Sequence, residues 1–321
     1  MSVLIVDGCS GNNRANTVII ASMPILFSPP RSSQSGLSTT LQTARRWAVV
    51  AILTILFGFP LWVMAVLSLR GDDPTLTAAG QSPLALLWVA TPVFSAYERL
   101  WQHAPIGLYA FNSLWVAVVT TVIHVFLCAL GGYALSRFPL SFRGINLKPW
   151  VFALMLGTLM VPPAVNIVPL FWMMAHLHWV DTPWALVIPG LFGAYGVYLF
   201  RQWFESIPPE LELAARLDGC NGWQTFWHIA LPLARPVVLA LGLFVVVGCW
   251  NSFLWPLMVT QSEHWRTLPV GIAALKSTYR DITDWPVLMA AATISVAPLL
   301  VLMAVGQRHW VTGLMAGGLK E

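Results

Sequence analysis

Long apolar stretches separated by short polar segments dominate the chain. Six of them are long enough to cross a bilayer as helices, and they occupy residues 47–67, 112–134, 150–174, 184–200, 236–259 and 287–305. About 20 apolar residues in a helix are needed to cross the hydrocarbon core of a membrane. The pattern therefore predicts an all-α integral membrane protein with six transmembrane helices.

The same pattern divides the chain into four parts. Residues 1–46 are rich in Ser, Asn, Gly and Pro and contain no spanning stretch, which predicts a disordered cytoplasmic tail. Residues 47–68 form the first transmembrane helix. Residues 108–306 form a core of five further spans, with a polar loop at about 202–235. Residues 307–321 are predicted to be a second cytoplasmic tail.

Composition excludes a soluble globular protein. Hydrophobic residues make up 57% of the 321 residues and charged residues 9%, and the mean hydropathy is +0.72, so there is too little polar surface to cover a globule. The spans are almost free of Asp, Glu, Lys and Arg, and the sequence contains no phosphate-binding loop of the G-x-x-x-x-G-K-[ST] type. We therefore predict no catalytic residue, no metal site and no cofactor in this chain.

Basic residues predict the orientation in the membrane. With a cytoplasmic N-terminus, the inner segments hold twelve Lys and Arg residues: Arg14, Arg31, Arg45, Arg46, Arg137, Arg143, Lys148, Arg201, Arg216, Arg235, Arg308 and Lys320. The outer segments then hold five: Arg70, Arg99, Arg266, Lys276 and Arg280. Since cytoplasmic loops carry the excess of Lys and Arg, both termini are predicted to be cytoplasmic. The same residues lie at span ends rather than in one patch, which argues against nucleic-acid binding.

The polar loop between the fourth and fifth spans predicts a helix–turn–helix on the cytoplasmic side. Ser206 is expected to cap the first helix, and Ala214 and Ala215 give that helix a smooth surface. Asp218 and Gly219 are expected to end it, because glycine takes the left-handed conformation at little steric cost. Such a loop is suited to docking into the groove of a partner protein.

A second short helix is expected to follow at 222–230, capped by Asn221, before Pro232 and Pro236 redirect the chain into the fifth span. The alternative is an amphipathic helix that lies on the lipid headgroups. Acidic residues at the start of the loop disfavour that alternative, because anionic lipids would repel them.

The loop sequence "ELELAARLDGCNGWQTFWHIALPLARP" resembles the EAA loop of ATP-binding-cassette (ABC) importer permeases. Three later stretches, "CWNSFLWPLMV", "TLPVGIAAL" and "QRHWVTGLMAGGLKE", are similar to the carbohydrate-uptake, maltose-type inner-membrane branch of that superfamily. The resemblance covers about residues 47–321. It implies the type-1 importer permease architecture, in which the loop is a coupling helix seated in a cleft of the ATPase subunit.

The resemblance also implies a function and a set of partners. The chain would be the membrane-spanning subunit of an ATP-driven importer for a sugar, oligosaccharide or polyol-type solute in the inner membrane. The alternative is a permease for a non-sugar solute such as glycerol phosphate, a peptide or an amino acid; an intramembrane enzyme or scaffold is disfavoured because the spans are almost free of Asp, Glu, Lys and Arg. The implied partners are an ABC ATPase dimer that binds ATP and Mg, a second permease subunit, an extracytoplasmic solute-binding protein and membrane lipid.

Two groups of site residues follow from the resemblance. The residues expected to couple to the ATPase are Glu212, Ala214, Ala215, Asp218, Gly219 and Pro232. The C-terminal tail is expected to reach the ATPase dimer through a non-helical segment that contains Gly313, Gly317 and Gly318. The chain departs from the family pattern at Leu213, where the family has Glu, and at Cys220, where it has Ala. Adjacent helical positions point about 100° apart, so Glu212 is not expected to replace the missing carboxylate.

Polar residues within the spans are candidates for the solute pathway. We select Asn166, Tyr195 and Asn251, and we treat Asn112 and His124 in the same way, because a polar group at membrane depth faces either a cavity or another helix. Each alone is more often a contact between helices. The "MVPPAV" stretch before Asn166 is expected to kink the third span.

Overall fold

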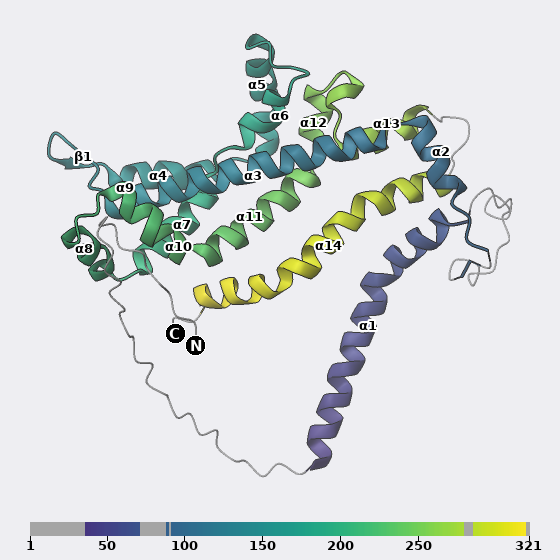
Figure 1. The fold of residues 1–321 in the computed structure, drawn as a ribbon, viewed down its shortest axis with the longest axis horizontal. Coiled ribbons are helices and arrows are strands. Elements are labelled where there is room, and N and C mark those ends of the chain that lie inside the picture. The colour runs from purple at the N-terminus through teal and green to yellow at the C-terminus, as the bar shows by residue number, and fades with distance from the viewer. Residues whose placement is uncertain (1–35, 71–87, 90, 279–284, 319–321) are drawn as a thin grey trace. The chain divides into compact units, whose positions relative to one another are not determined.

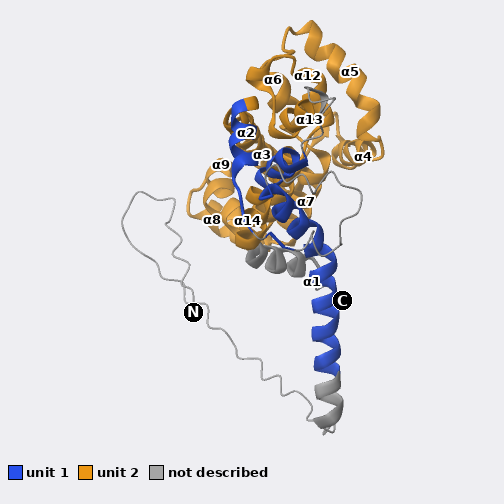
Figure 2. Cartoon of the chain, turned by 90° about the vertical axis from the view of Figure 1, so that its right-hand side faces the viewer, with its two compact units in different colours: residues 1–5, 14–102, 282–294 blue, residues 6–13, 103–281, 295–321 orange. Residues whose placement is uncertain are grey.

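The computed structural model of the protein describes residues 36–70, 88–89, 91–278 and 285–318 (Figure 1). The chain forms two compact units, which Figure 2 colours separately. The first comprises residues 1–5, 14–102 and 282–294, and the second comprises residues 6–13, 103–281 and 295–321. Most of the tail predicted at 1–46 lies outside the described residues.

The first unit is built around the helix α1, Gly36–Ser68. Its apolar side chains are mostly exposed, as expected for a helix that faces lipid. The helix begins at Gly36 rather than at the predicted Trp47. Near its end, Ser68 Oγ lies 2.9 Å from the hydroxyl of Tyr97 on α2, Ser95–His103, and this contact ties the two helices together.

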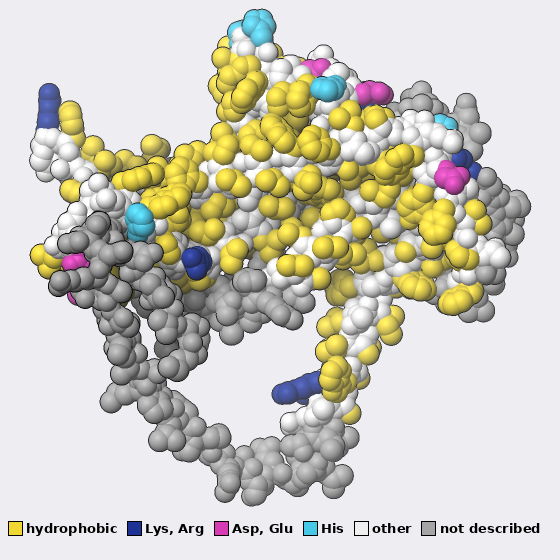
Figure 3. All heavy atoms as spheres, viewed as in Figure 1, with side chains coloured by type: hydrophobic (Ala, Val, Ile, Leu, Met, Phe, Trp, Pro, Cys, Tyr) yellow, Lys and Arg dark blue, Asp and Glu magenta, His cyan; other side chains and the backbone are white. Residues whose placement is uncertain are grey.

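The core of the second unit consists of three packed helices: α3, Ile106–Arg137; α7, Ala194–Ser206; and α11, Arg235–Trp250. Gly132 allows α3 and α7 to touch, since a Cβ there would lie 2.5 Å from the Cβ of Phe200. Figure 3 shows a hydrophobic middle over α3 and α11, whereas acidic and basic side chains appear at the end that carries α8 and the β-hairpin.

Two of the predicted spans are broken helices. The Pro-Pro stretch separates α4, Lys148–Thr158, from α5, Pro163–His176, and the two helices meet at 95°. The kink predicted there is thus a near right-angle break, because Pro162 has an extended backbone and neither proline donates an N–H. The fourth span consists of α6, Pro183–Val187, a 3₁₀ turn at Ile188–Gly190, and α7, with a bend of 41°.

The fifth span ends earlier than its hydrophobic pattern predicts. α11 stops at Trp250, and the apolar residues beyond it form a separate helix, α12, Leu254–Val259. A 3₁₀ turn at Glu263–Trp265 and the helix α13, Leu268–Thr278, follow.

The last helix, α14, runs from Trp285 to Gly318. The prediction that Gly313, Gly317 and Gly318 prevent a helix in the tail is therefore wrong. The cost of a helix lies mainly in its nucleation, so a helix already formed by the sixth span can extend through several glycines.

The predicted number of spans agrees with the structure. Among the described residues, three helices are long and apolar enough to cross a membrane, and the three bent helix pairs bring the number to six if each pair is one span. A feature that the hydrophobic pattern did not predict is a hairpin between α3 and α4. It pairs β1, Ser141–Phe142, with β2, Ile145–Asn146, through Arg143 and Gly144, both at positive φ.

Candidate functional site

The polar loop forms a short helix, α8, Pro209–Leu217, that ends in a glycine turn. Asp218 is its C-cap, and Gly219 has φ = +87°, so the predicted left-handed glycine is confirmed. The amide of Gly219 donates to the carbonyl of Arg216 at 3.1 Å, and the amide of Cys220 donates to the carbonyl of Ala215 at 2.9 Å. These hydrogen bonds satisfy carbonyls that the end of the helix leaves without intrahelical partners.

The predicted cap of this helix is wrong. Ser206 is the last residue of α7, and its hydroxyl donates to the carbonyl of Trp203 at 2.7 Å. The N-cap position of α8 belongs to Pro208, which makes no side-chain capping bond. A serine hydroxyl can donate to a carbonyl of the preceding helical turn, and Ser206 makes that bond instead of capping α8.

A second helical segment returns the chain to the membrane. Asn221 caps α9, Gly222–Thr225, and forms a capping box with Gln224, with N–O distances of 2.8 and 2.9 Å. The predicted helix at 222–230 is confirmed, but its second half is π-helical and leads into α10, Leu231–Leu233, which contains Pro232. The helical stretch from Gly222 to Leu233 meets α11 at 75°.

An ion pair holds α8 to the end of α3. Arg137 Nε donates to Glu212 Oε1 at 2.7 Å, and the Arg137 Nη2 group donates to the carbonyls of Phe204 and Ile207 at 2.8 and 2.9 Å. The hydroxyl of Tyr133 lies 3.4 Å from Glu212 Oε2. Glu212 is only 5% exposed, so its carboxylate is held by groups of the chain itself. We call these three side chains, Tyr133, Arg137 and Glu212, the coupling latch.

Aromatic rings surround the latch and make it rigid. Tyr133 packs edge-on against Phe138 and Phe204, and it also contacts Phe226 of the π-helical segment at a centroid distance of 5.2 Å. Phe204 and Phe226 are fully buried. The ends of α3 and α7 and the start of the returning segment therefore form one packed unit.

The opposite face of α8 is open and mostly apolar, with Glu210 exposed at its start. Leu217 is 89% exposed, and Leu211 and Leu213 on the same helix are also exposed. Ala214, Asp218 and Gly219 are exposed with them, whereas Ala215 is buried against the chain itself. Burial of Glu212 and exposure of Leu213 confirm that these neighbouring positions point in different directions. We call this exposed set, Leu211, Leu213, Ala214, Leu217, Asp218 and Gly219, the docking face.

A second polar junction fixes the opposite ends of the helices. Asp181 accepts hydrogen bonds from the amides of Gln261 and Ser262, both at 3.0 Å, and its own amide donates to the carbonyl of Val259 at 2.7 Å. Burial raises the pKa of this carboxyl. The hydrogen bonds from Ser262, and then that from Gln261, lower the pKa, and together they outweigh burial, so the pKa lies below its usual value. The loop after α5 is thereby tied to the segment after α12.

The polar residues of the spans fall into two groups. Asn112 is buried and donates to the carbonyls of His264 and Arg266 at 2.7 and 3.0 Å, and His124 Nδ1 lies 2.7 Å from the carbonyl of Gly190. These two residues connect elements of the fold. The three selected pathway candidates, by contrast, are exposed on separate elements: Asn166 on α5, Tyr195 on α7 and Asn251 at the end of α11. No hydrogen bond joins any two of these three described side chains.

Sequence reasoning missed the coupling latch. The charge pattern identifies Arg137 only as a basic residue at a span end, and Arg137 is 75 positions from Glu212. The available signal was an arginine in the last turn of a span and a glutamate in the loop that returns to the same membrane face.

The fold and the site define a class of protein: a multi-pass helical membrane protein with a helical loop that is held by a buried ion pair and exposes an apolar face. A family model described as "Binding-protein-dependent transport system inner membrane component" matches residues 129–314. The chain belongs to this family and is thus a membrane-embedded transport component.

Individual relatives agree with this assignment. The probable ABC transporter permease protein YurM of Bacillus subtilis is 33% identical over 278 residues, which is 85% of this chain and 87% of the relative. The arabinooligosaccharides transport system permease protein AraQ of Halalkalibacterium halodurans is 35% identical over 209 residues, or 65% of this chain and 72% of the relative.

A solved structure shows the same fold. The crystal structure of a bacterial ABC transporter involved in the import of the acidic polysaccharide alginate contains a chain that superposes with a TM-score of 0.71 at 22% identity. The superposition covers 86% of this chain and 99% of that one. The type-1 importer permease architecture expected from the resemblance is confirmed.

Proposed function

We propose that the chain translocates a sugar or oligosaccharide as the permease subunit of an ATP-driven importer. The observation that carries the proposal is the docking face: an apolar, exposed helix surface held from behind by the buried pair of Arg137 and Glu212. A surface that must transmit movement has to be rigid relative to the spans, and the coupling latch provides that rigidity. The name of the AraQ relative supports an oligosaccharide as the solute class.

The proposed energy source is a partner ATPase dimer that binds ATP and Mg. Its subunit would receive α8 in a cleft, with Leu217 and Leu213 as apolar anchors and Ala214 and Gly219 allowing close approach. Asp218 would add a polar contact at the rim, and Pro232 would fix the turn toward α11. A second permease subunit and an extracytoplasmic solute-binding protein complete the proposed importer in the inner membrane.

Solute-stimulated ATP hydrolysis tests this function. The complete importer is reconstituted in vesicles with its solute-binding protein, and arabino-oligosaccharides, maltose, glycerol phosphate and a dipeptide are added in turn. We expect stimulation by a saccharide. Stimulation by glycerol phosphate or the dipeptide alone would establish the alternative solute class instead.

Both termini are proposed to be cytoplasmic, which places the docking face on the side of the ATPase. Alkaline phosphatase, which is active only outside the cytoplasm, is expected to be inactive when fused after Glu321 and active when fused after Arg70. The basis is the excess of Lys and Arg in the proposed inner segments. An active fusion at Glu321 would contradict the six-span orientation.

The C-terminal tail is proposed to contact the ATPase dimer through the segment that contains Gly313, Gly317 and Gly318. A truncation after His309 is expected to lower solute-stimulated ATPase activity severalfold while the amount of inserted protein stays unchanged. Insertion depends on the apolar part of α14, which the truncation retains. Unchanged stimulation at equal protein levels would show that the tail has no coupling role.

A further inference from the structure

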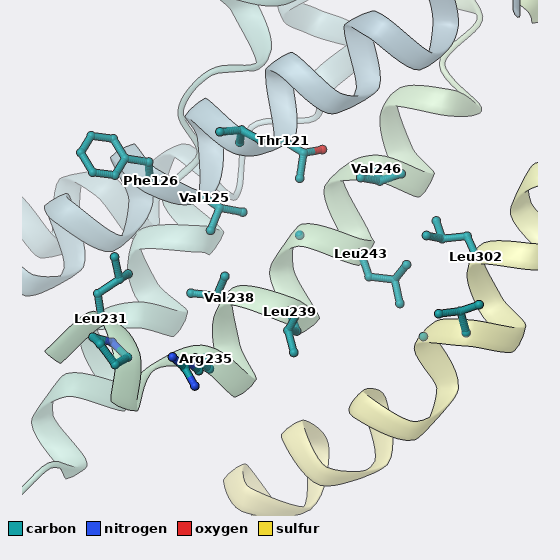
Figure 4. Close-up of a pocket in the computed structure, with 15 residues that line it drawn as sticks. Thr121, Val125, Phe126, Leu231, Arg235, Val238, Leu239, Leu243, Val246 and Leu302 are labelled. Atoms are coloured by element: carbon teal, nitrogen blue, oxygen red, sulfur yellow. The ribbon is translucent and has the colours of Figure 1, made fainter. Parts of the chain in front are cut away.

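An apolar groove runs between α3, α11 and α14 and ends at α10 (Figure 4). Its volume is about 740 Å³. Apolar side chains supply most of its wall, among them Val125, Phe126, Val238, Leu239, Leu243 and Leu302. All of these residues belong to the second unit.

The groove does not have the chemistry of a sugar site. A saccharide needs several hydrogen-bonding groups in its pocket, and the only polar side chains in this lining are those of Thr121 and Arg235. The candidate pathway residues Asn166, Tyr195 and Asn251 are absent from it. A long apolar chain fits this lining better than a polar solute does.

Small residues leave the groove open. Gly242 on α11 lines the groove and has no side chain to fill it. A Cβ there would meet only the Thr121 and Val125 side chains, at 3.7 and 3.9 Å. Two contacts join α14 to α11 beside the groove: the indole N–H of Trp250 donates to the carbonyl of Ser295 at 3.0 Å, and Gly306 lies against Leu243. Residues of both helices line the groove.

A single positive charge marks one end of the groove. Arg235 is the first residue of α11 and is exposed, and it makes no hydrogen bond or ion pair with any described part of the chain. This contrasts with Arg137 and Arg201, which are both paired with glutamates. Arg235 also lies at the junction of α10 and α11, next to the polar loop, and lipid phosphates are expected at such a span end.

We propose that the groove binds an anionic phospholipid. One acyl chain lies along the apolar wall between α11 and α14, and the phosphate pairs with the guanidinium of Arg235. A guanidinium presents several N–H donors in a fork that matches phosphate oxygens, and it keeps its charge at any physiological pH. The anionic headgroup supplies a negative counter-charge for Arg235, and the groove supplies apolar contact for the acyl chain. This inference is independent of which solute the protein carries.

Lipid retention by the purified importer tests the proposal. The complex is exchanged into nanodiscs that contain equal amounts of phosphatidylglycerol and phosphatidylcholine. Native mass spectrometry then counts the lipids that stay bound to the complex after it is released from the nanodisc. We expect phosphatidylglycerol to be retained preferentially. Arg235→Gln is expected to lower its retention roughly fivefold, the effect of one basic charge near a membrane surface, and Arg235→Lys should retain most of it.

Two further variants separate the groove from general surface charge. Arg143→Gln removes an exposed cation at the hairpin, outside the groove, and is expected to leave retention unchanged. Gly242→Leu fills the groove and is expected to displace the lipid even though Arg235 is intact. Equal retention of the two lipids, or equal loss in Arg235→Gln and Arg143→Gln, would overturn the proposal. So would a disulfide between a cysteine placed at Leu239 and a cysteine in the second permease subunit, because a segment of that subunit would then occupy the groove.

Discussion

Replacing Glu212 with glutamine is expected to uncouple the transporter although its side chain is buried within the chain. The substitution preserves size but leaves the Arg137 guanidinium, largely buried, without its counter-charge. Removal of one member of a buried ion pair typically costs about 3–5 kcal/mol. Most of that cost should appear as loosening of α8, since Arg137 and Tyr133 are the groups that hold Glu212.

The readout is the amount of ATPase subunit that co-purifies with the permease, together with solute-stimulated ATP hydrolysis. We expect both to fall at least tenfold in Glu212→Gln. Glu205→Gln is the matched control, because Glu205 also pairs with an arginine, Arg201, but lies on α7 with a side chain that is 39% exposed. Equal behaviour of the two variants would show that the coupling latch does not support the docking face.

A double substitution isolates the pair itself. Arg137→Gln should resemble Glu212→Gln, and it should also release the carbonyls of Phe204 and Ile207. Combining the two changes removes both charges at once, so the loss in the double variant is expected to be smaller than the sum of the single losses. Additive losses would mean that the two residues act separately.

Gly219→Val is expected to abolish coupling while the spans remain inserted. Gly219 has φ = +87°, and a β-branched residue in that conformation is strained by roughly 1–3 kcal/mol. A Cβ at this position meets no atom of the chain within 4 Å, so any steric clash of the new side chain would be with the partner. The expected result is loss of ATPase co-purification and of transport at a normal level of membrane protein.

Two companion variants separate strain from bulk. In Gly219→Asn the new residue can adopt the left-handed conformation with little strain, although it adds a side chain at the docking face. This variant should therefore retain part of the coupling. Leu213→Glu changes an exposed position of the same face to the residue that the family carries, and it should be tolerated. If Gly219→Val keeps the partner and transport at wild-type levels, the loop is not the coupling element, and contact with lipid headgroups would explain it better.

Local sequence signals predicted the parts of the site that depend on neighbouring residues. The positive φ of Gly219 and the cap at Asn221 follow from backbone preferences that operate within one helical turn. The opposite orientations of Glu212 and Leu213 follow from helix geometry alone. Ser206 failed as a cap because its hydroxyl had two possible local partners, and the sequence does not rank them.

The sequence by itself determined that the chain crosses a membrane, roughly where it does so, and that a helical loop with a glycine turn lies between two spans. These properties depend on runs of apolar residues and on turn chemistry, which are local. Only the tertiary structure decided that the third span breaks at 95°, that α14 continues through its glycines, and that Arg137 meets Glu212. The physical reason is that pairing between residues far apart in sequence depends on how the helices pack, and packing is a property of the whole core rather than of any one segment.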